Sequence, residues 1–277
     1  MTETVLIIGG GQAGGQAALS LRHYGFEGAV TIIGDEPYVP YERPPLSKGF
    51  LAGEVPEERM FMRPAAFYAE KNITLMQGAT VTRIDRASRC VHLASGEPLA
   101  YSKLVLATGG RVRKMVCPGA SLSGVHYLRT INDVLHFRDR MTAGTRLVIV
   151  GGGYIGLEVA AVAIKRGCAV TVLEMMPLVL SRVVAPEMSH FYTEVHRTAG
   201  VDIRTSTAVT AFEGIGKIER VVCGEQTIEA DLVVIGIGIV PNVELAADAG
   251  LAVDNGIVVD DCARTADPDI FAAGDCT

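Results

Sequence analysis

Short, wholly apolar segments alternate along the chain with segments whose small or apolar residues recur at helical spacing. The run TVLIIGG from Thr4 ends in glycine and is typical of a strand that is buried on both faces. From Gln12 to His23, small residues recur on one face, which favours a helix lying close to a sheet. A second apolar run, AVTIIGD from Ala29, follows this helix. The N-terminal part of the chain therefore predicts a β-α-β unit.

The same pattern returns in the middle of the chain. TRLVIVGGG from Thr145 predicts a strand, Tyr154 to Arg166 a helix with Gly156 and Ala160 facing inward, and CAVTVLE a closing strand. Further strands are expected in KLVLATGG, ADLVVIGIG and DPDIFAAGDCT, and a charged helix is expected over residues 186–199. This order predicts an α/β fold of two Rossmann-like dinucleotide-binding domains with mostly parallel sheets.

Both units carry a glycine-rich loop between the first strand and the helix. In the pattern G-x-G-x-x-G, the first glycine makes a tight turn, the second lets the backbone approach a pyrophosphate, and the third permits close helix–strand packing. The helix N-terminus supplies N–H donors to the phosphates. The glycines concerned are Gly9, Gly11 and Gly14 in the first loop, and Gly151, Gly153 and Gly156 in the second. Because each loop follows a strand and opens a helix, the chain is predicted to bind two dinucleotides.

Each unit ends its second strand with a carboxylate that can accept hydrogen bonds from an adenosine ribose. These residues are Asp35 and Glu174; Glu36 is an alternative to Asp35, which is favoured because it ends the strand. A 2′-phosphate would require Arg or Lys nearby, but the residues EMMPLV from Glu174 supply a repelling carboxylate and apolar neighbours. We therefore expect NAD(H) rather than NADP(H) at the second loop.

Composition and charge exclude several classes of protein. Hydrophobic residues make up 49% of the chain, which is enough for a sizeable core, and the net charge of −6 argues against nucleic-acid or anionic-membrane partners. The six cysteines form no C-x-x-C pair and the histidines show no ligand spacing, so no metal is expected. Scattered cysteines, no signal peptide and no long apolar run predict a soluble, cytoplasmic protein. The basic residues Arg111, Arg113 and Lys114 fit a solvated loop and an anion-binding or docking site equally well.

Four further segments occur in a set order with the two loops. They are PYERPPLSK from Pro40, LATGGRVR from Leu106, GIGIVPNVELA from Gly236 and IFAAGDCT from Ile270. With the loops, they make the chain resemble, over essentially its whole length, the FAD-dependent NADH:ferredoxin reductases of aromatic-ring dioxygenase systems. These form the putidaredoxin and rubredoxin reductase-like branch of the pyridine nucleotide-disulfide oxidoreductase superfamily. The resemblance implies FAD at the first loop, NAD(H) at the second, and electron transfer to a [2Fe-2S] ferredoxin or a rubredoxin.

The resemblance also implies individual site residues. For FAD these are the first-loop glycines with Ala13, Asp35, Arg43, Lys48, Val81, Arg129 and Asp275; for NAD(H) they are the second-loop glycines with Ile155 and Glu174. Thr108, Gly109 and Gly238 are further cofactor-binding candidates. Lys48 and Glu158 are expected to form an ion pair beside the flavin ring that tunes its reduction. Alternatively, Val81 is an ordinary strand residue, Lys48 and Arg129 are surface charges, and Asp275 is a helix N-cap.

Chain order implies that the FAD-binding domain is split. Residues 1–111 begin it, residues 112–241 form the NAD-binding domain, and residues 242–277 return to the FAD-binding domain. The family continues beyond this point into a helix and a C-terminal interface domain. We therefore expect the natural protein to be longer, and this chain alone to retain FAD poorly and to reduce ferredoxin slowly.

Three alternative functions remain open on the sequence. The thiol pair of the glutathione-reductase branch is missing where PYERPPLSK stands, so disulfide reduction is disfavoured. A rubredoxin reductase and an NADH oxidase of the same fold are the alternatives with turnover. A module that binds FAD and NAD(H) without turnover is the alternative from another class.

Overall fold

The computed structural model describes residues 3–277 and divides into two compact units. Unit 1 comprises the described residues up to Glu42, Glu57–Arg111 and Val240–Thr277, and unit 2 comprises Arg43–Pro56 and Val112–Ile239. The segment Arg43–Pro56 thus groups with unit 2, whereas the boundaries read from the sequence placed it in the first part of the FAD-binding domain. The cause is local packing, because Phe50 and Leu51 are buried and their carbonyl oxygens accept hydrogen bonds from Arg138 and Arg166 of unit 2.

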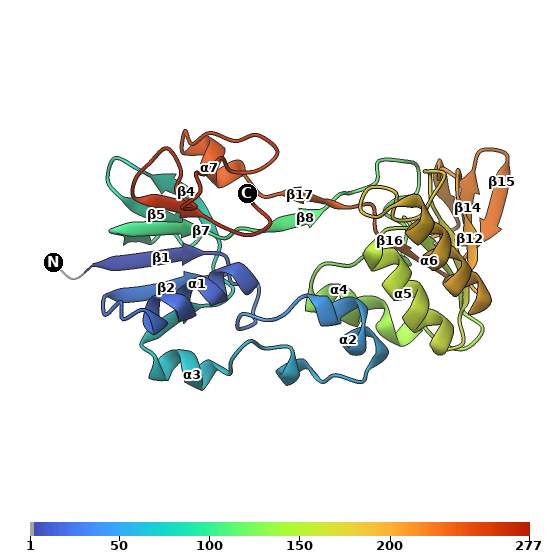
Figure 1. Cartoon of the computed structure of the whole chain (residues 1–277), viewed down its shortest axis with the longest axis horizontal. Helices are drawn as coiled ribbons and strands as arrows, with labels where there is room; N and C mark the ends of the chain where they lie inside the picture. The colour runs from blue at the N-terminus through green and yellow to red at the C-terminus, as the bar shows by residue number, and fades with distance from the viewer. Residues whose placement is uncertain (1–2) are drawn as a thin grey trace. The chain divides into compact units, whose positions relative to one another are not determined.

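Unit 1 is built on a five-stranded sheet whose order is β18-β7-β1-β2-β3; Figure 1 labels β7, β1 and β2 of this sheet. Every neighbouring pair of strands is parallel. The helix α1 (Gln12–His23) follows β1 and lies close to the sheet because Gly14, Gly15 and Ala18 form its buried face. The strands are β1 (Thr4–Ile8), β2 (Ala29–Ile33), β3 (Ile73–Met76), β7 (Lys103–Leu106) and β18 (Ile270–Ala272).

Both faces of this sheet are covered, which explains why its strands are mostly apolar. One face packs against α1, and Ala18 belongs to the same core cluster as Val5 and Ile32. The other face packs against an antiparallel sheet, whose Val91 shares a cluster with Leu104. The antiparallel strands are β4 (Val81–Asp85), β5 (Cys90–Leu93) and β6 (Pro98–Ala100), and the helices that complete the unit are α3 (Ala65–Glu70), α7 (Glu244–Asp248) and the 3-10 turn η2 (Glu57–Arg59).

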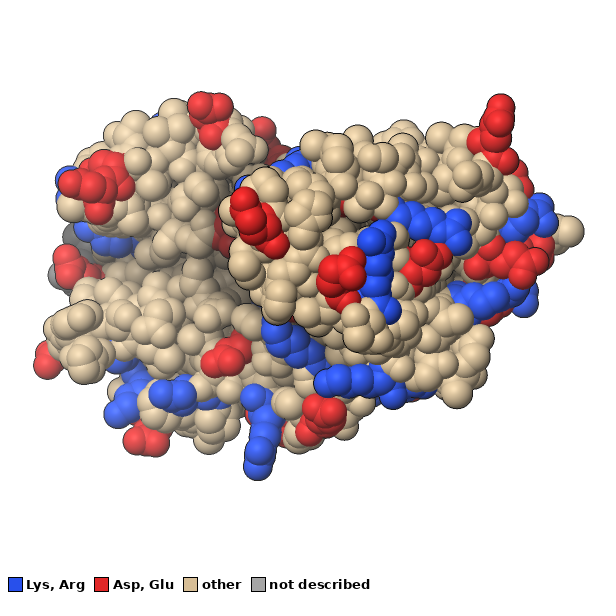
Figure 2. All heavy atoms as spheres, turned by 45° about the vertical axis from the view of Figure 1, so that its right-hand side comes forward, with Lys and Arg blue, Asp and Glu red and all other residues tan. Residues whose placement is uncertain are grey.

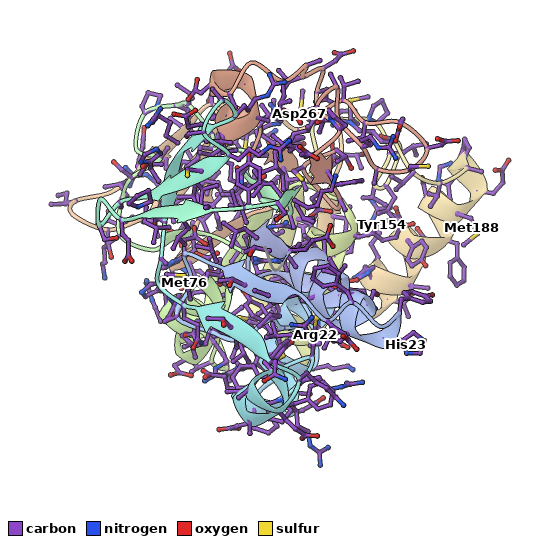
Figure 3. All side chains as sticks on the ribbon, turned by 90° about the vertical axis from the view of Figure 1, so that its left-hand side faces the viewer. Arg22, His23, Met76, Tyr154, Met188 and Asp267 are labelled. Atoms are coloured by element: carbon purple, nitrogen blue, oxygen red, sulfur yellow. The ribbon has the colours of Figure 1, made fainter. Side chains whose placement is uncertain are left out.

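The end of α1 is tied to the neighbouring loops by an arginine. Arg22 and His23 stand at this end of the helix, and Met76 ends the edge strand β3 (Figure 3). The guanidinium of Arg22 donates to the carbonyl oxygens of Phe26, at 2.6 Å, and Asn72, at 2.8 Å. These bonds fix the turn from α1 into β2, so the loop at the other end of the helix is carried by a rigid element.

Unit 2 repeats the arrangement of unit 1. Its parallel sheet has the order β12-β11-β10-β16-β9, so β10 takes the place of β1, β11 that of β2 and β16 that of β7. The helix α5 (Tyr154–Lys165) corresponds to α1, and Gly156 and Ala160 are buried on its inner face as expected. The strands are β9 (Val125–Tyr127), β10 (Arg146–Val150), β11 (Ala169–Leu173), β12 (Asp202–Arg204) and β16 (Leu232–Ile235).

Smaller elements complete unit 2. An antiparallel sheet of β13 (Ala211–Glu213), β14 (Arg220–Cys223) and β15 (Gln226–Glu229) packs on the parallel sheet. The helical elements are α4 (Ile131–Phe137), α6 (Pro186–Thr198), α2 (Gly49–Ala52) and the 3-10 turns η1 (Pro44–Ser47) and η3 (Arg138–Arg140). Two short paired strands, β8 (Gly110–Val112) and β17 (Ile239–Pro241), contain the points where the chain passes between units.

The expected α/β fold with parallel sheets is confirmed, and the surface agrees with the modest net charge. On the face shown in Figure 2, basic and acidic side chains are interspersed among uncharged residues. Within residues 3–277, no helix combines the length and the apolar character that crossing a membrane requires.

Candidate functional site

The two glycine-rich loops have the same backbone geometry. Gly9 and Gly151 have φ values of +123° and +110°, which favour glycine. The N–H of Gly9 donates to Ile33 at the end of β2, and the N–H of Gly151 donates to Leu173 at the end of β11, each at 2.8 Å. Both loops therefore stand at the carboxyl end of the central strand, where the strand order reverses and α/β proteins bind ligands.

The third glycine of each loop allows the helix to approach the loop backbone. A Cβ atom at Gly14 would lie 2.0 Å from the carbonyl oxygen of Gly9, and one at Gly156 would lie 2.1 Å from that of Gly151. Any side chain at these positions would push the helix away from the strand. The third-glycine role expected from the sequence agrees with this geometry.

Both helix N-termini are left open to an anion. The N-caps are Gly11 and Gly153, and among residues 3–277 no side chain caps either helix and no acidic residue lies in either first turn. The first N–H groups of a helix have no intrahelical acceptor, and the helix dipole adds positive charge there. Ala13 and Ile155 are each the second residue of their helix, so their N–H groups belong to this unpartnered set.

The second glycine of the second loop, Gly153, borders open space. No described atom lies within 4 Å of the position that a Cβ atom would take at Gly153. The space that a pyrophosphate needs is therefore left free by this glycine, and the residues present fit a dinucleotide at this loop.

In unit 1, the residues that follow two other strands, β7 and β18, lie against the first glycine loop. A Cβ atom at Gly9 would lie 2.0 Å from the oxygen of Ala107, after β7, and one at Gly274, after β18, would lie 2.8 Å from the Cβ atom of Ala13. Thr108 and Gly109 therefore lie beside the first loop, and Asp275 directly follows Gly274, which lies close to Ala13. The structure brings these expected FAD residues together within one unit.

Asn242 holds the backbone of Thr108 and Gly109 in place. Its side-chain amide donates to the oxygen of Thr108 at 2.8 Å, and its own N–H donates to the oxygen of Gly109 at 2.9 Å. The hydroxyl of Thr108 donates back to the Asn242 carbonyl at 2.7 Å. Asn242 was not expected as a site residue, although it stands in the segment GIGIVPN that the sequence singled out.

The carboxylates that follow β2 and β11 differ in their surroundings. Asp35 is exposed and is separated from the end of β2 by Gly34, while Glu36 accepts a hydrogen bond from the hydroxyl of Tyr41 at 2.7 Å. Glu174 accepts from the N–H of Gly152 at 2.7 Å and from the N–H of Met176 at 2.8 Å. Glu174 thus touches the second glycine loop directly.

The strand end beyond the second loop carries Gly238. A Cβ atom at Gly151 would lie 2.4 Å from the oxygen of Gly236, so the residues after β16 line the loop just as those after β7 do in unit 1. Gly238 has φ +101° and open space around it. Ile155 and Tyr154 begin α5 beside this loop, and both side chains are exposed (Figure 3 labels Tyr154).

The expected ion pair between Lys48 and Glu158 is present in unit 2. The Nζ atom of Lys48 lies 2.8 Å from Oε1 of Glu158, which confirms that the two charges are within ion-pairing reach. Ser47, which was not expected as a site residue, donates its hydroxyl to Oε2 of the same carboxylate at 2.5 Å.

Arg43 and Arg129 are also neighbours in unit 2. The guanidinium of Arg43 donates to the carbonyl oxygen of Arg129 at 2.6 Å, and Arg129 directly precedes Thr130, the N-cap of α4. The residues expected at the FAD site are thus divided, because Arg43, Lys48 and Arg129 lie in unit 2 with the expected NAD(H) residues.

Two further expectations concern Val81 and metals. Val81 begins β4 and its side chain is buried in the core of unit 1, as an ordinary strand residue would be. Within residues 3–277, one group of side chains could bring metal-ligating atoms together, namely Asp260, Asp261 and Cys262. All three are exposed.

The fold and the two loops agree with comparisons to known proteins. Residues 3–277 match the model of the pyridine nucleotide-disulphide oxidoreductase family. Rhodocoxin reductase from Rhodococcus erythropolis is 47% identical over 99% of the chain, and putidaredoxin reductase from Pseudomonas putida is 48% identical over 99% of it. The chain spans 64% and 67% of the length of these two relatives.

Solved structures give the same result. The covalent complex of putidaredoxin reductase with putidaredoxin superimposes with a TM-score of 0.95 at 47% identity, and covers 99% of this chain and 67% of that one. A ferredoxin reductase from Rhodopseudomonas palustris superimposes with a TM-score of 0.96 at 42% identity, covering 99% of this chain and 68% of that one. The resemblance to the ferredoxin reductases that the sequence motifs indicated is thereby confirmed, and the chain belongs to the pyridine nucleotide-disulphide oxidoreductase family.

Proposed function

We propose that the chain is an FAD-dependent NADH:ferredoxin oxidoreductase, which passes electrons from NADH through FAD to a small [2Fe-2S] protein. The observation that carries this proposal is the pair of matched glycine loops, each at the carboxyl end of a central parallel strand and each with an uncapped helix N-terminus. One chain that binds two dinucleotides is suited to moving electrons between them.

Unit 1 is the proposed FAD-binding domain and unit 2 the proposed NAD-binding domain. The N–H groups at the start of α1 and α5 hold the two pyrophosphates, and Asp35 and Glu174 accept hydrogen bonds from the two adenosine riboses. The carboxylate of Glu174 and the lack of a basic residue in EMMPLV favour NADH over NADPH.

The chemistry and the role of the ion pair follow from these assignments. FAD held at the first loop would supply the redox chemistry, namely acceptance of a hydride from NADH and release of single electrons to the acceptor protein. Lys48 and Glu158 place a fixed pair of charges, 2.8 Å apart, that tunes this step electrostatically. Arg43, Val81, Thr108, Gly109, Arg129, Gly238 and Asp275 complete the proposed cofactor-binding set.

Relatives of known function support the choice of acceptor. One is named as the ferredoxin–NAD(+) reductase component of a biphenyl dioxygenase system, at 40% identity, and another is solved in complex with putidaredoxin. A ferredoxin that supplies an oxygenase is therefore the proposed partner. Rubredoxin is the second candidate, because rubredoxin-NAD(+) reductase from Pseudomonas putida is 41% identical. The six free cysteines support a reducing compartment such as the cytoplasm.

Anaerobic mixing of the FAD-loaded chain with NADH tests the proposal. We expect the visible flavin band to bleach with NADH and to bleach much more slowly with NADPH. Reoxidation by a ferredoxin, a rubredoxin or oxygen, added separately, distinguishes the three kinds of reductase and oxidase. A flavin spectrum that NADH leaves unchanged would show a binding module without turnover.

A further inference from the structure

Ser47 stands at the junction between the segment Arg43–Pro56 and helix α5. It ends η1 and is only 3% exposed, yet its side chain is polar. Its hydroxyl donates to Oε2 of Glu158 at 2.5 Å, across 111 residues of sequence. The other oxygen of the same carboxylate, Oε1, lies 2.8 Å from Nζ of Lys48. Both oxygens of Glu158 therefore have a partner in the same short segment.

The ion pair alone is too exposed to fix its own geometry. The side chain of Lys48 is 51% exposed and that of Glu158 is 29% exposed. Exposed pairs of this kind gain little from Coulomb attraction, and both long side chains lose rotamer freedom when they pair. A third group that hydrogen-bonds to the carboxylate can fix the geometry of the ion pair, because Glu158 then presents Oε1 to Lys48 in one orientation.

The backbone of Ser47 is well suited to be that fixed point. Leu46, Phe50 and Leu51 are buried around it. Arg166 donates to the oxygen of Leu51 at 3.1 Å, and the guanidinium of Arg138 lies 5.2 Å from the ring centroid of Phe50. The segment is thereby anchored on unit 2, so the hydroxyl holds the carboxylate rather than following it.

We propose that Ser47 is a positioning residue for the Lys48–Glu158 pair. It orients the Glu158 carboxylate so that the Lys48 ammonium is held between Oε1 and the carbonyl oxygen of Pro44, which lies 3.3 Å from Nζ. This proposal rests on the proposed function, in which the pair tunes flavin reduction. Ser47 acts through Glu158 and does not itself touch the reacting atoms.

The matched variants are Ser47→Ala and Ser189→Ala. Both remove a fully or nearly fully buried hydroxyl from unit 2, but Ser189 has no described hydrogen-bond partner for its hydroxyl. In a crystal structure of Ser47→Ala, we expect the distance from Nζ to Oε1 to exceed the 4 Å limit of an ion pair. An unchanged distance would overturn the proposal. Should Ser47→Ala fail to fold, Ser47→Cys keeps the side-chain size, weakens the donor and answers the same question.

Flavin reduction measured in a single anaerobic turnover supplies the functional readout. We expect Ser47→Ala to slow reduction at saturating NADH about tenfold, as for loss of a hydrogen bond to a charged group, with NADH affinity unchanged. Ser189→Ala is expected to reduce at the wild-type rate. Equal slowing by the two variants would mean that buried packing, not positioning, is responsible.

A double-mutant cycle shows whether Ser47 acts through Glu158. In the Glu158→Ala background, Ser47→Ala is expected to have no further effect on the reduction rate, because the group it holds is gone. Effects that multiply independently would overturn the proposal. If NADH fails to reduce the wild-type flavin, the proposed function fails, while the Nζ–Oε1 distance still decides the positioning role of Ser47.

Discussion

At the scale of single residues, Glu174 has two tasks that a sequence pattern merges into one. Its carboxylate accepts hydrogen bonds from the N–H groups of Gly152 and Met176 and so orders the second glycine loop. In the proposed function it also accepts hydrogen bonds from the ribose. In that proposal, its negative charge would also repel the 2′-phosphate of NADPH.

We expect Glu174→Ala to weaken the use of NADH and to relax discrimination against NADPH. Removal of one acceptor and one repelling charge should shift the ratio of the two kcat/KM values by about 1–3 kcal/mol. Steady-state kinetics with both nucleotides measure this ratio. Glu187→Ala, which removes an exposed glutamate from α6, is the control. A ratio that stays the same in Glu174→Ala would exclude Glu174 as the ribose ligand.

The candidate site residues that the sequence offered are those with a local signal. Glu174 follows β11 directly, Asp35 follows β2 after one glycine, and the glycines keep a set spacing, so each could be proposed without knowledge of the fold. Ser47 and Asn242 could not, because their partners lie 111 and 134 residues away. A single serine or asparagine in a sequence gives no indication of a hydrogen bond to a residue more than a hundred positions away.

At the scale of elements, each loop and its helix act together. The glycines of one loop differ in what surrounds them, since a Cβ atom at Gly156 would lie 2.1 Å from a backbone oxygen whereas one at Gly153 would meet nothing within 4 Å. A side chain at Gly156 should therefore affect folding stability, whereas one at Gly153 should affect nucleotide binding.

Gly156→Ala should destabilise unit 2 by about 1–3 kcal/mol, because the clashing backbone oxygen cannot move aside. Gly153 has φ −79° and ψ −178°, a backbone conformation that alanine adopts freely. We therefore expect Gly153→Ala to lower the free energy of unfolding by less than about 1 kcal/mol. Its added methyl group should instead weaken NADH binding roughly tenfold, which corresponds to 1.4 kcal/mol. Urea unfolding and NADH titration measure the two effects. Equal stability losses in the two variants would contradict the geometry.

Helix α6 shows the limit of pattern reading for an element. Its existence was predicted, and it spans Pro186–Thr198. Its buried face, however, carries Ser189, Thr193 and His196, while Met188 and Phe191 are exposed (Figure 3 labels Met188). Hydrophobicity alone would predict that the face with Met188 and Phe191 is the buried one. Packing against α5 and β12 decides the face.

At the scale of the whole molecule, the buried His196 and the half-buried His126 make stability depend on pH. Burial lowers the pKa of His196. Burial also lowers the pKa of His126, with smaller lowering contributions from Arg140 and His136 and an opposing one from Asp133. Between the lowered pKa and the unfolded value of about 6.5, the unfolded chain binds more protons than the folded chain. Stability therefore rises with pH in this window.

We expect the free energy of unfolding to fall as the pH is lowered from about 7.5 through 6.5, and the loss to level off below the folded pKa values. Urea unfolding across this pH range measures it. His196→Gln should reduce the slope, whereas His190→Gln, at an exposed position of the same helix, should not. Stability that increases towards acid pH would contradict the prediction.

Much of the architecture was readable from the sequence, since parallel strands buried on both faces leave continuous apolar runs. The placement of Arg43–Pro56 was not, because it depends on where Phe50 and Leu51 find an apolar surface. Segments near in sequence do not have to share a core.

During synthesis, unit 1 begins to be translated before unit 2, but its parallel sheet is completed later, because unit 2 interrupts it in the sequence. Every strand of the unit 2 parallel sheet lies between Val125 and Ile235, whereas β18 of unit 1 is not made until Ile270. As the chain leaves the ribosome, all strands of the unit 2 sheet are available before β18 has been synthesised. The pairing of β7 with β18, in which Leu104 lies opposite Ile270, can therefore form only later. Closing that long loop costs entropy, so unit 1, whose first strands are translated before unit 2, completes its sheet after unit 2.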